Sequence, residues 1–352
     1  MAEQAARGRR RASIYDVANH AGVSHMTVSR VLNDHPNIRE STRQRVLQAI
    51  AEMNYTPSSI ARALATQRAM RIGVLIDAPV QYGPGSTLRA LEAAARNVGY
   101  SVSAFSISDD DDTQINAGVL ELVAQGVDAL CVIAPRASSL DALRRQRTGL
   151  PTIVVKAEED ADWHTVAVDQ RAGAMSAVTH LIERGHRSIA HLAGPLDWYD
   201  ARERAGGWRD ALALAGLSAP PPVAGDWTSD CGYAVGLDAD RAFAAADPVT
   251  AVFAANDQMA LGLIHGLADR GIRVPEDISV VGFDDLPDAR HFLPPLTTVR
   301  QDFAALGELV LRQIVAAIDG EQNTRHDLIE PTLVVRSSTA ASGQGERRRS
   351  AG

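Results

Sequence analysis

The side chains best suited to acid–base catalysis are the adjacent carboxylates of Asp284 and Asp285. Catalysis of that kind needs two groups that face the same bond of a substrate, whereas neighbouring residues of a turn point in different directions. The sequence also has no nucleophile elbow, phosphate-binding loop or metal-ligand spacing. It therefore predicts a protein that is not an enzyme and binds no metal or cofactor, with a catalyst on a parallel α/β fold as the alternative.

The chain has two cysteines, Cys131 and Cys231, which lie far apart and lack CxxC or histidine-rich spacing. Neither a disulfide framework nor a zinc site is therefore indicated. We expect both cysteines to be buried as small apolar side chains.

Basic residues are concentrated in the first fifth of the 352-residue chain, although the formal net charge is -8. Residues 1–71 contain 11 arginines and five acidic residues, whereas the remainder contains 24 basic and 38 acidic residues. This asymmetry predicts a polyanion-binding head on an acidic body, although a solvated basic tail would give the same count. The length favours two or three domains.

The sequence has no run of about 18 apolar residues that could span a membrane, and residues 1–13 lack the apolar stretch of a secretory signal. We therefore expect a cytoplasmic protein without a membrane partner.

Three short helices are predicted in the basic part of the chain. Ser13 and Asp16 have the spacing of a capping box, and the helix that they begin stops at Gly22. Ser24 can cap a second helix directly afterwards, and a third is predicted from about residue 40 to residue 53. The residues expected to be buried on the second and third helices are Val28, Val31, Leu32, Val46, Leu47, Ile50 and Met53. Helices joined by such a tight glycine turn are typical of a helix-turn-helix head.

From residue 71 onward, short β-rich runs alternate with helical stretches. The runs are RIGVLID, YSVSAFSIS, VDALCVIAP, PTIVVK, TVAVD, SIAHLAG, TAVFAAND and ISVVGFDD. Such alternation predicts parallel sheets flanked by helices. Because roughly 270 residues exceed one sheet unit, we expect two subdomains that face a cleft at the carboxyl ends of their strands.

Seven segments resemble the LacI/GalR family of transcriptional regulators in order and spacing, over about residues 13–339. They are YDVANHAGVSHMTVSRVLN, NYTPSSIARALAT, LAGPLDWYDARERAGGW, AGDW, ANDQMALG, ISVVGFDD and PPLTTVRQDF. The resemblance implies an α/β protein with a three-helix helix-turn-helix head, a hinge helix and a two-subdomain core of parallel sheets like that of periplasmic binding proteins.

The domain boundaries that follow are a disordered basic tail (1–12), the head (13–56), the hinge (57–70), the core (71–340) and a disordered tail (341–352). Within the core we expect one subdomain from about 71–167 and 302–330, and a second from about 168–301 and 331–340.

The resemblance places the start of the second helix in the DNA major groove, where His25 and Met26 would discriminate base edges. His25 can donate or accept a hydrogen bond, Met26 can offer apolar contact to a thymine methyl, and Arg30 can bond guanine or phosphate. Plain solvated helix residues are the alternative. The residues expected to position the phosphates are Tyr15, Ser24, Thr27, Ser29 and Asn33. Because the repressor that gives the family its name carries Tyr and Gln at the paired reading positions, the operator preferred here need not be the same.

The hinge is expected to form a second DNA contact. In the family this segment folds when two copies lie in the minor groove, each inserting a leucine; Leu64 holds that position, and Ala61 is small enough for close approach. Core packing is the alternative use of Leu64. The resemblance therefore implies a homodimer on a palindromic double-stranded DNA operator. The final residues carry no leucine heptad, so we expect no tetramer.

The core is expected to bind a sugar, which needs hydrogen-bond partners for its hydroxyls and an apolar surface for its ring. By resemblance, Arg204, Asn256 and Asp284 would bond hydroxyls, Trp227 and Phe303 would pack on the ring, and Gln301 would lie at the cleft rim. Taken singly, each could equally be an ordinary surface, turn or core residue.

Lys156 is the main departure from the family pattern, since an acidic residue holds this position in the member that names the family. It is the only lysine in the chain, and its charge would allow an effector with a carboxylate, a phosphate or different hydroxyl stereochemistry. Alternatively, its flexible stem could turn to solvent or onto Asp284. Asp77 could then supply the missing acceptor.

The function implied is a sequence-specific repressor, active at the nucleoid, whose operator affinity is lowered by a sugar such as a galactoside or related glycoside. The alternatives are a regulator that uses its ligand as corepressor and a sugar-binding receptor without a DNA role.

Overall fold

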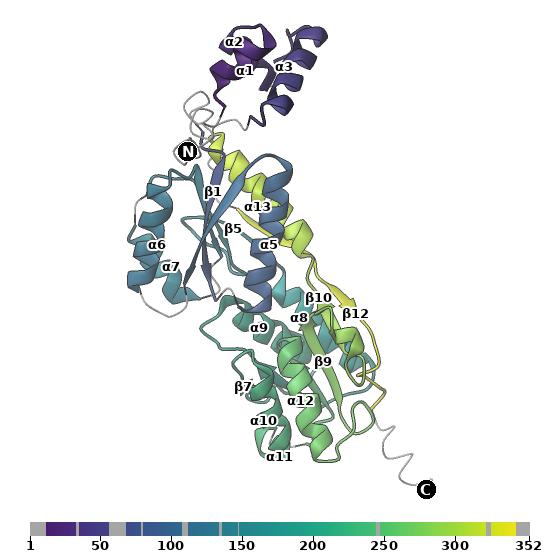
Figure 1. Ribbon diagram of the computed structural model, residues 1–352. Coiled ribbons are helices and arrows are strands. Elements are labelled where there is room, and N and C mark those ends of the chain that lie inside the picture. Colours follow the sequence, from purple (N-terminus) through teal and green to yellow (C-terminus); the bar gives the residue numbers. More distant parts are fainter. Residues whose placement is uncertain are drawn as a thin grey trace, which may run out of the picture. The chain divides into compact units, whose positions relative to one another are not determined.

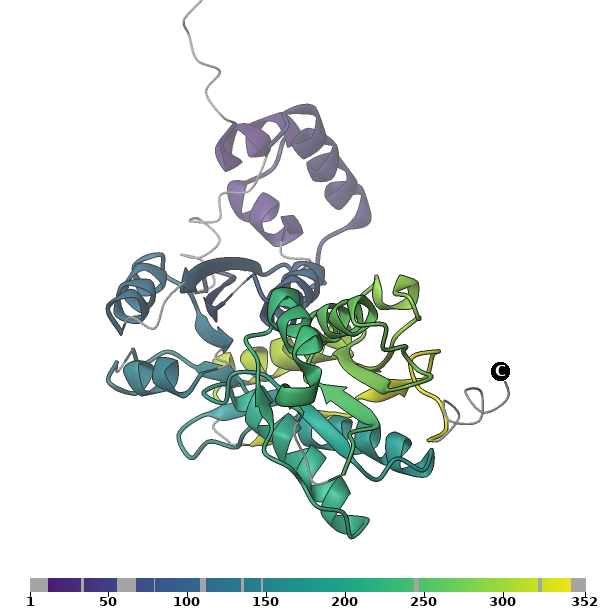
Figure 2. The ribbon, with the colours of Figure 1, turned by 90° about the horizontal axis from the view of Figure 1, so that it is seen from below.

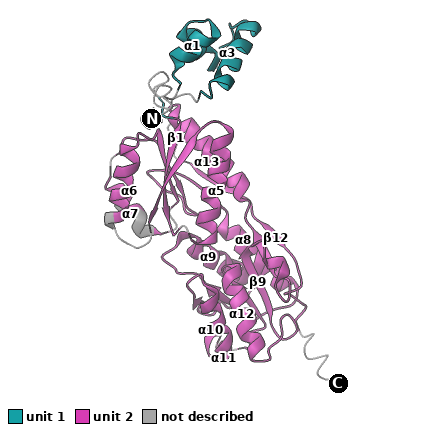
Figure 3. Cartoon of the chain, in the orientation of Figure 1, with its two compact units in different colours: residues 1–69 teal, residues 70–352 magenta. Residues whose placement is uncertain are grey.

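The computed structural model describes residues 12–32, 35–55, 68–78, 80–107, 112–133, 136–146, 148–243, 247–321 and 325–342. The chain forms two compact units, residues 1–69 and residues 70–352 (Figure 3). Most of both expected tails, most of the hinge, and Asn33 lie outside the described residues.

The first unit contains three short helices, α1 (Ile14–Ala21), α2 (His25–Leu32) and α3 (Glu40–Glu52). The predicted capping box is present. The Ser13 backbone N–H donates to the Asp16 carboxylate, and the Asp16 backbone N–H donates to the Ser13 hydroxyl. Gly22 ends α1 with a φ of 64°, a conformation that a side chain disfavours. The start and end of α1 are thus determined by local interactions.

The core of the first unit is built on Val17, Val28 and Val46, which are all fully buried. The prediction that Leu47 is buried was wrong: half of it is exposed, and Ala49 is buried instead. The reason is helical periodicity, since residues three apart share a face whereas consecutive residues lie about 100° apart around the axis.

The second unit begins with a sheet of six parallel strands in the order β11-β5-β4-β3-β1-β2. Its strands are β1 (Arg71–Asp77), β2 (Ser101–Ile107), β3 (Ala129–Ile133), β4 (Thr152–Val155), β5 (His164–Val168) and β11 (His326–Ile329). Helices α5 (Tyr82–Asn97) and α13 (Phe303–Ile318) pack on one face and α6 (Asp112–Ala124) and α7 (Ala137–Arg144) on the other (Figure 1).

A second six-stranded sheet has the order β12-β10-β9-β8-β6-β7 and is parallel except for the pair β10–β12. Its strands are β6 (Ile189–Ala193), β7 (Val223–Ala224), β8 (Ala251–Ala254), β9 (Ser279–Asp284), β10 (Thr297–Arg300) and β12 (Thr332–Val334). Its helices are α8 (Gln170–Glu183) and α9 (Tyr199–Leu214) on one face, α10 (Ser229–Leu237) and α12 (Asp257–Asp269) on the other, and the short α11 (Ala239–Ala242) and η1 (Ala289–His291). Figure 2 shows the helices around the sheets from a perpendicular direction.

The chain passes between the two sheets three times, after β5, after β10 and after β11. Within each sheet, the parallel strands have their carboxyl ends at the same edge. The loops that follow these ends carry polar side chains, and they therefore meet at this edge. This arrangement confirms the predicted α/β core with two subdomains.

The two cysteines differ in burial. Cys131 lies in β3, and burial raises the pKa of its thiol to about 12. Cys231 is partly exposed on α10, so the prediction that it is buried was wrong. Its neighbour Gly232, rather than Cys231, faces α12.

No helix among the described residues is long and apolar enough to cross a lipid bilayer.

Helices α10 and α12 pack so closely that glycine is required at their contact. A Cβ atom at Gly262 would lie 1.8 Å from the carbonyl oxygen of Ser229, and one at Gly232 would lie 2.1 Å from that of Met259. Backbone atoms cannot move aside as a flexible side chain can. The close contact of α10 with α12 therefore depends on the absence of a side chain at Gly232 and Gly262.

We expect Gly262→Ala to lower the free energy of unfolding by about 2–4 kcal/mol, because α10 and α12 must separate to admit the methyl group. Urea unfolding followed by circular dichroism measures the change. Gly83→Ala is the control, since no atom lies within 4 Å of a Cβ built there; equal stability of the two variants would contradict the prediction.

Candidate functional site

The N-terminus of α2 presents the predicted DNA-reading side chains to solvent. His25, Met26 and Arg30 are all exposed, Met26 to 56%. A methionine that is so exposed does not contribute to the hydrophobic core of the head. The geometry suits readout of base edges, which requires side chains that project from the surface of the helix.

The residues predicted to contact phosphates surround this surface. Ser24 begins α2 by accepting a hydrogen bond from the Thr27 N–H at 3.2 Å, and the two hydroxyls are 3.0 Å apart. Tyr15 is 61% exposed, and its ring lies 5.1 Å from that of His25. Ser29 is partly buried on the same helix. Three other predicted DNA contacts, Asn33, Ala61 and Leu64, lie outside the described residues.

In the second unit, two small cavities lie side by side at the carboxyl ends of the strands. The first, of about 40 Å³, is lined among others by three predicted residues, Lys156, Gln301 and Phe303. The second, of about 30 Å³, is lined among others by Arg204, Trp227, Asn256 and Asp284. Both cavities are lined by Gly83, Pro84 and Asp200. The sequence thus identified residues from six separate segments that the fold brings together.

Asp77 is the one predicted effector residue that lines neither cavity. Arg136 donates to one of its carboxylate oxygens at 2.7 Å and also bonds the other, which makes a bidentate ion pair. Its two oxygens are therefore already engaged by the protein.

Arg204 is the centre of a hydrogen-bonded network that fills the cleft. Its Nε donates to Gln170 Oε1 at 2.9 Å, another N–H donates to the Ala255 carbonyl, and Nη2 lies 3.4 Å from Asp284 Oδ1. Gln301 Nε2 in turn donates to Asp284 Oδ1 at 2.7 Å and accepts from Gln170 at 2.9 Å. These hydrogen bonds fix the planar guanidinium, amide and carboxylate groups in orientations that suit hydrogen bonds to the vicinal hydroxyls of a sugar.

Asn256 and Trp227 are fixed together. Asn256 caps α12 by accepting from the Met259 N–H at 2.9 Å, and its amide donates to the Trp227 carbonyl at 3.0 Å. This bond holds Trp227 at a φ of 74° with its ring against Trp198. The indole Nε1 of Trp227 is buried and has no hydrogen-bond partner, which marks a position where a ligand oxygen can accept.

Phe303 is partly buried at the start of α13, and its ring meets the Tyr82 ring edge-on at 5.7 Å. The pair forms an apolar wall suited to the C–H surface of a sugar ring.

Lys156 turns neither to solvent nor onto Asp284, so the alternative raised from the sequence was wrong. It is 5% exposed, its Nζ donates to Asp160 Oδ2 at 2.7 Å, and it lies 4.7 Å from the centre of the Tyr199 ring. Burial alone would raise the pKa of Asp160, but the hydrogen bond from Lys156 holds this pKa below its usual value. The lysine charge is therefore neutralised within the protein.

Asp284 and Asp285 bind different partners, as predicted. Asp284 faces Arg204 and Gln301, whereas Asp285 accepts from Arg300 at 2.7 Å and from Arg336 at 2.6 Å. Both have a positive φ, 107° and 50° respectively. Such backbone strain is found preferentially at ligand sites.

Burial raises the pKa of the Asp284 carboxyl to about 6, in spite of Arg204 and the hydrogen bond from Gln301. Because this folded-state pKa exceeds the ordinary value of 3.8, the folded protein binds the proton more tightly than the unfolded chain does. The resulting stabilisation is fully present below the unfolded pKa and is lost as the pH rises through the folded pKa.

We therefore expect the difference in unfolding free energy between wild type and Asp284→Asn to shift by up to about 3 kcal/mol between about pH 4 and pH 8, with wild type favoured at acid pH. Urea titrations of both proteins across this range measure it. Parallel pH profiles would refute the assignment.

Sequence reasoning missed several residues that line the cleft. They are Gln81, Tyr82, Gln170, Trp198 and Asp200. All follow the carboxyl end of β1, β5 or β6, so their place in the chain was a usable signal.

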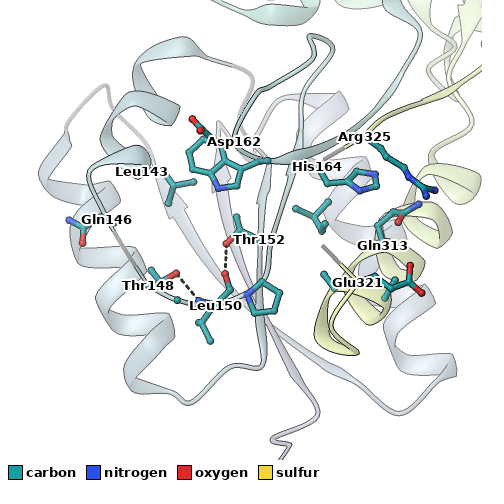
Figure 4. A pocket seen from close by; sticks show the side chains of 16 residues that line it. Leu143, Gln146, Thr148, Leu150, Thr152, Asp162, His164, Gln313, Glu321 and Arg325 are labelled. Atoms are coloured by element: carbon teal, nitrogen blue, oxygen red, sulfur yellow. Dashed lines mark hydrogen bonds between the residues drawn. The ribbon is translucent and has the colours of Figure 1, made fainter. Parts of the chain in front are cut away.

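A larger cavity, of about 720 Å³, lies elsewhere, at the amino ends of β4 and β5 beside the end of α13 (Figure 4). Thr148 and Thr152 bond the backbone of Leu150 along one wall. Within the described part of the chain, the buried side-chain atoms without a partner are His191 Nε2, Trp227 Nε1 and Gln258 Oε1, and none of these residues lines it. The smaller cavities are the better candidate for a ligand site.

Two family models match the chain. Residues 13–58 match the model described as bacterial regulatory proteins, lacI family, and residues 178–339 match a periplasmic binding protein-like domain. The first match covers the head, and the second covers all six strands of the second sheet.

Curated relatives match nearly the whole length. The lactose operon repressor of Escherichia coli (strain K12) is 33% identical over 94% of this chain and 91% of its own. The HTH-type transcriptional repressor PurR of Mannheimia succiniciproducens is 34% identical over 93% of this chain and 98% of its own. The ribose operon repressor of Escherichia coli is 34% identical over 92% of this chain and 94% of its own. All three are repressors rather than enzymes.

Solved structures agree with these matches. The lac repressor dimer bound to operator and the anti-inducer ONPF aligns with a TM-score of 0.81 at 33% identity, over 94% of this chain and all of that one. A complex of the transcriptional regulator CelR with cellobiose aligns with a TM-score of 0.69 at 29% identity, over 93% of this chain and all of that one.

Proposed function

This chain belongs to the lacI family of bacterial regulatory proteins, and from that membership we propose that it is a transcriptional repressor that releases its operator when a sugar occupies the cleft. The observation that carries the proposal is the Arg204 network beside the unpartnered Trp227 Nε1. Its donors and acceptors are already oriented, and one buried donor still lacks an acceptor. A neutral polyhydroxyl ligand supplies both kinds of partner.

The operator is proposed to be a palindromic double-stranded DNA site read by a homodimer. His25 and Met26 would read base edges from the exposed start of α2, and Arg30 would contact guanine or phosphate. Tyr15, Ser24, Thr27, Ser29 and Asn33 would position the backbone. Ala61 and Leu64 would act in the minor groove. The similarity to the lac repressor dimer bound to operator supports a dimer on operator DNA.

The effector site is proposed to comprise Arg204, Asn256, Asp284 and Gln301 for hydroxyls, with Trp227 and Phe303 against the ring. Lys156 would shape the adjoining cavity through Asp160 and Tyr199 rather than by binding an anion. A galactoside or related glycoside is our candidate class. Asp77 would orient the neighbouring Arg136 and act on the ligand only if that ion pair opens.

The switch is proposed to act through contacts that cross the cleft. Lys156 lies over the Tyr199 ring, Glu158 bonds Arg202 at 2.9 Å, and a backbone bridge joins Arg136 to Trp198. A ligand that repacks these contacts changes the angle between the subdomains and so the spacing of the hinges in a dimer. The effect on operator affinity equals the ratio of ligand affinities for the two forms.

The test is a fluorescence anisotropy titration of a selected palindromic DNA with and without monosaccharides, disaccharides and purines. We expect a sugar to weaken operator binding. Strengthening by a ligand would establish the alternative, a corepressor, and no effect of any ligand would contradict the switch. A protein that binds a sugar but no DNA would be a receptor instead.

A further inference from the structure

We propose that Asp200 selects an uncharged sugar by accepting a hydrogen bond from a ligand hydroxyl at the junction of the two cavities. The proposal rests on the proposed function and assigns the chemical class of its ligand. The sequence did not single out Asp200, and the acceptor considered earlier, Asp77, is engaged by Arg136.

The position of Asp200 is the first line of support. It lies in the first turn of α9 and is the only ionisable residue that lines both cavities among the described residues. Gly83 and Pro84, at the start of α5, are the other residues shared by the two cavities. A ligand that occupies both cavities therefore passes the carboxylate of Asp200.

The second line of support is the way the charges in the cleft are paired. Lys156 binds Asp160 at 2.7 Å, and Asp284 accepts from Gln301 at 2.7 Å and lies 3.4 Å from Arg204. Asp200, by contrast, lies 4.0 Å from Arg204, beyond hydrogen-bond range, and a third of its side chain is exposed. Its carboxylate is thus the acidic group in the cleft best placed to accept from a ligand.

The balance of charge then favours a neutral ligand. Both cations of the lining, Lys156 and Arg204, already have carboxylate partners, so no excess positive charge faces the cavities. A phosphate or carboxylate of the ligand would meet the Asp200 carboxylate while the nearest cation, Arg204, is already paired with Asp284, and such an anion pair is costly in a buried site.

The unpartnered donor completes the argument. Trp227 lines the cavity that Asp200 also lines, and its indole Nε1 is buried without an acceptor. The site therefore offers one donor, which needs an acceptor, and one carboxylate, which needs a donor. A hydroxyl can donate and accept, so a polyhydroxyl compound satisfies both groups without carrying charge.

The experiment measures binding by calorimetry to the full-length protein. The probes are glucose, galactose, lactose and cellobiose, together with glucose 6-phosphate, galactose 1-phosphate, glucosamine and galactosamine. We expect an uncharged sugar to bind most tightly. We expect Asp200→Asn to lower the affinity for that sugar by roughly 10- to 100-fold, because the amide is a weaker acceptor and brings a competing donor.

The matched control is Asp197→Asn. Asp197 is exposed, lies three positions earlier and lines neither cavity, so we expect this variant to bind the sugar with wild-type affinity. Thermal melting checks that both variants fold, and Asp200→Ser, which also removes the charge, serves as a second variant. Tighter binding of a phosphorylated or amino sugar, or unchanged affinity of the folded Asp200 variants, would overturn the assignment while leaving the repressor proposal intact. Binding of no probe at all would count against both.

Discussion

Replacing Arg204 with alanine is expected to leave operator binding intact and to lower sugar affinity by about 100-fold or more. Arg204 is 4% exposed, and its guanidinium bonds Gln170 and the Ala255 carbonyl beside Asp284. Its loss removes the donors that face the ligand and leaves the Asp284 carboxylate without its cation. The variant should therefore repress without responding to sugar, as measured by anisotropy with operator DNA and by calorimetry with sugar.

Arg209→Ala is the matched control, because Arg209 is exposed on the same helix, α9. Arg204→Lys keeps the charge but cannot reproduce two planar contacts, so we expect it to respond weakly. A folded Arg204→Ala protein that releases operator at the wild-type sugar concentration would show that the network does not bind the ligand.

Replacing His25 and Met26 together with alanine is expected to reduce the ratio of operator affinity to non-specific DNA affinity by roughly 100-fold. The two side chains are exposed at the start of α2, away from the buried Val28 and Val31. Their loss should remove base contacts and leave phosphate contacts in place. Competition between a selected palindrome and random DNA, at one stated salt concentration, measures the ratio.

Gln44→Ala, on the exposed side of α3, serves as control. An equal loss of affinity for both DNAs in the double variant would mean that His25 and Met26 contact the backbone instead of bases. Unchanged affinity for both would remove α2 from the proposed interface.

The elements that could be predicted from sequence are those determined by local interactions. The limits of α1 follow from Ser13, Asp16 and Gly22, which act within a few residues. Buried strands such as β1 and β9 have continuous apolar runs. The short strands β7, β10, β11 and β12 were not predicted as strands, because pairing with distant strands rather than their own composition determines them.

The candidate site was only partly predictable for a similar reason. Arg204, Asn256 and Asp284 were identified through resemblance, but a sequence does not show which loops converge on one point. Asp200 and Gln170 were not identified from the sequence, and the fold places both in the cleft near the starts of α9 and α8. The pairing of Lys156 with Asp160 likewise depends on how the loop after β4 folds back.

The central claim is that sugar binding in the cleft and operator binding by the head oppose each other, and reciprocal titration tests it most directly. The operator affinity is measured with and without saturating sugar, and the sugar affinity is measured with and without saturating operator. The account predicts that each ligand weakens the other by the same factor, about 5- to 150-fold. Identical sugar affinities for the free and operator-bound protein would contradict it.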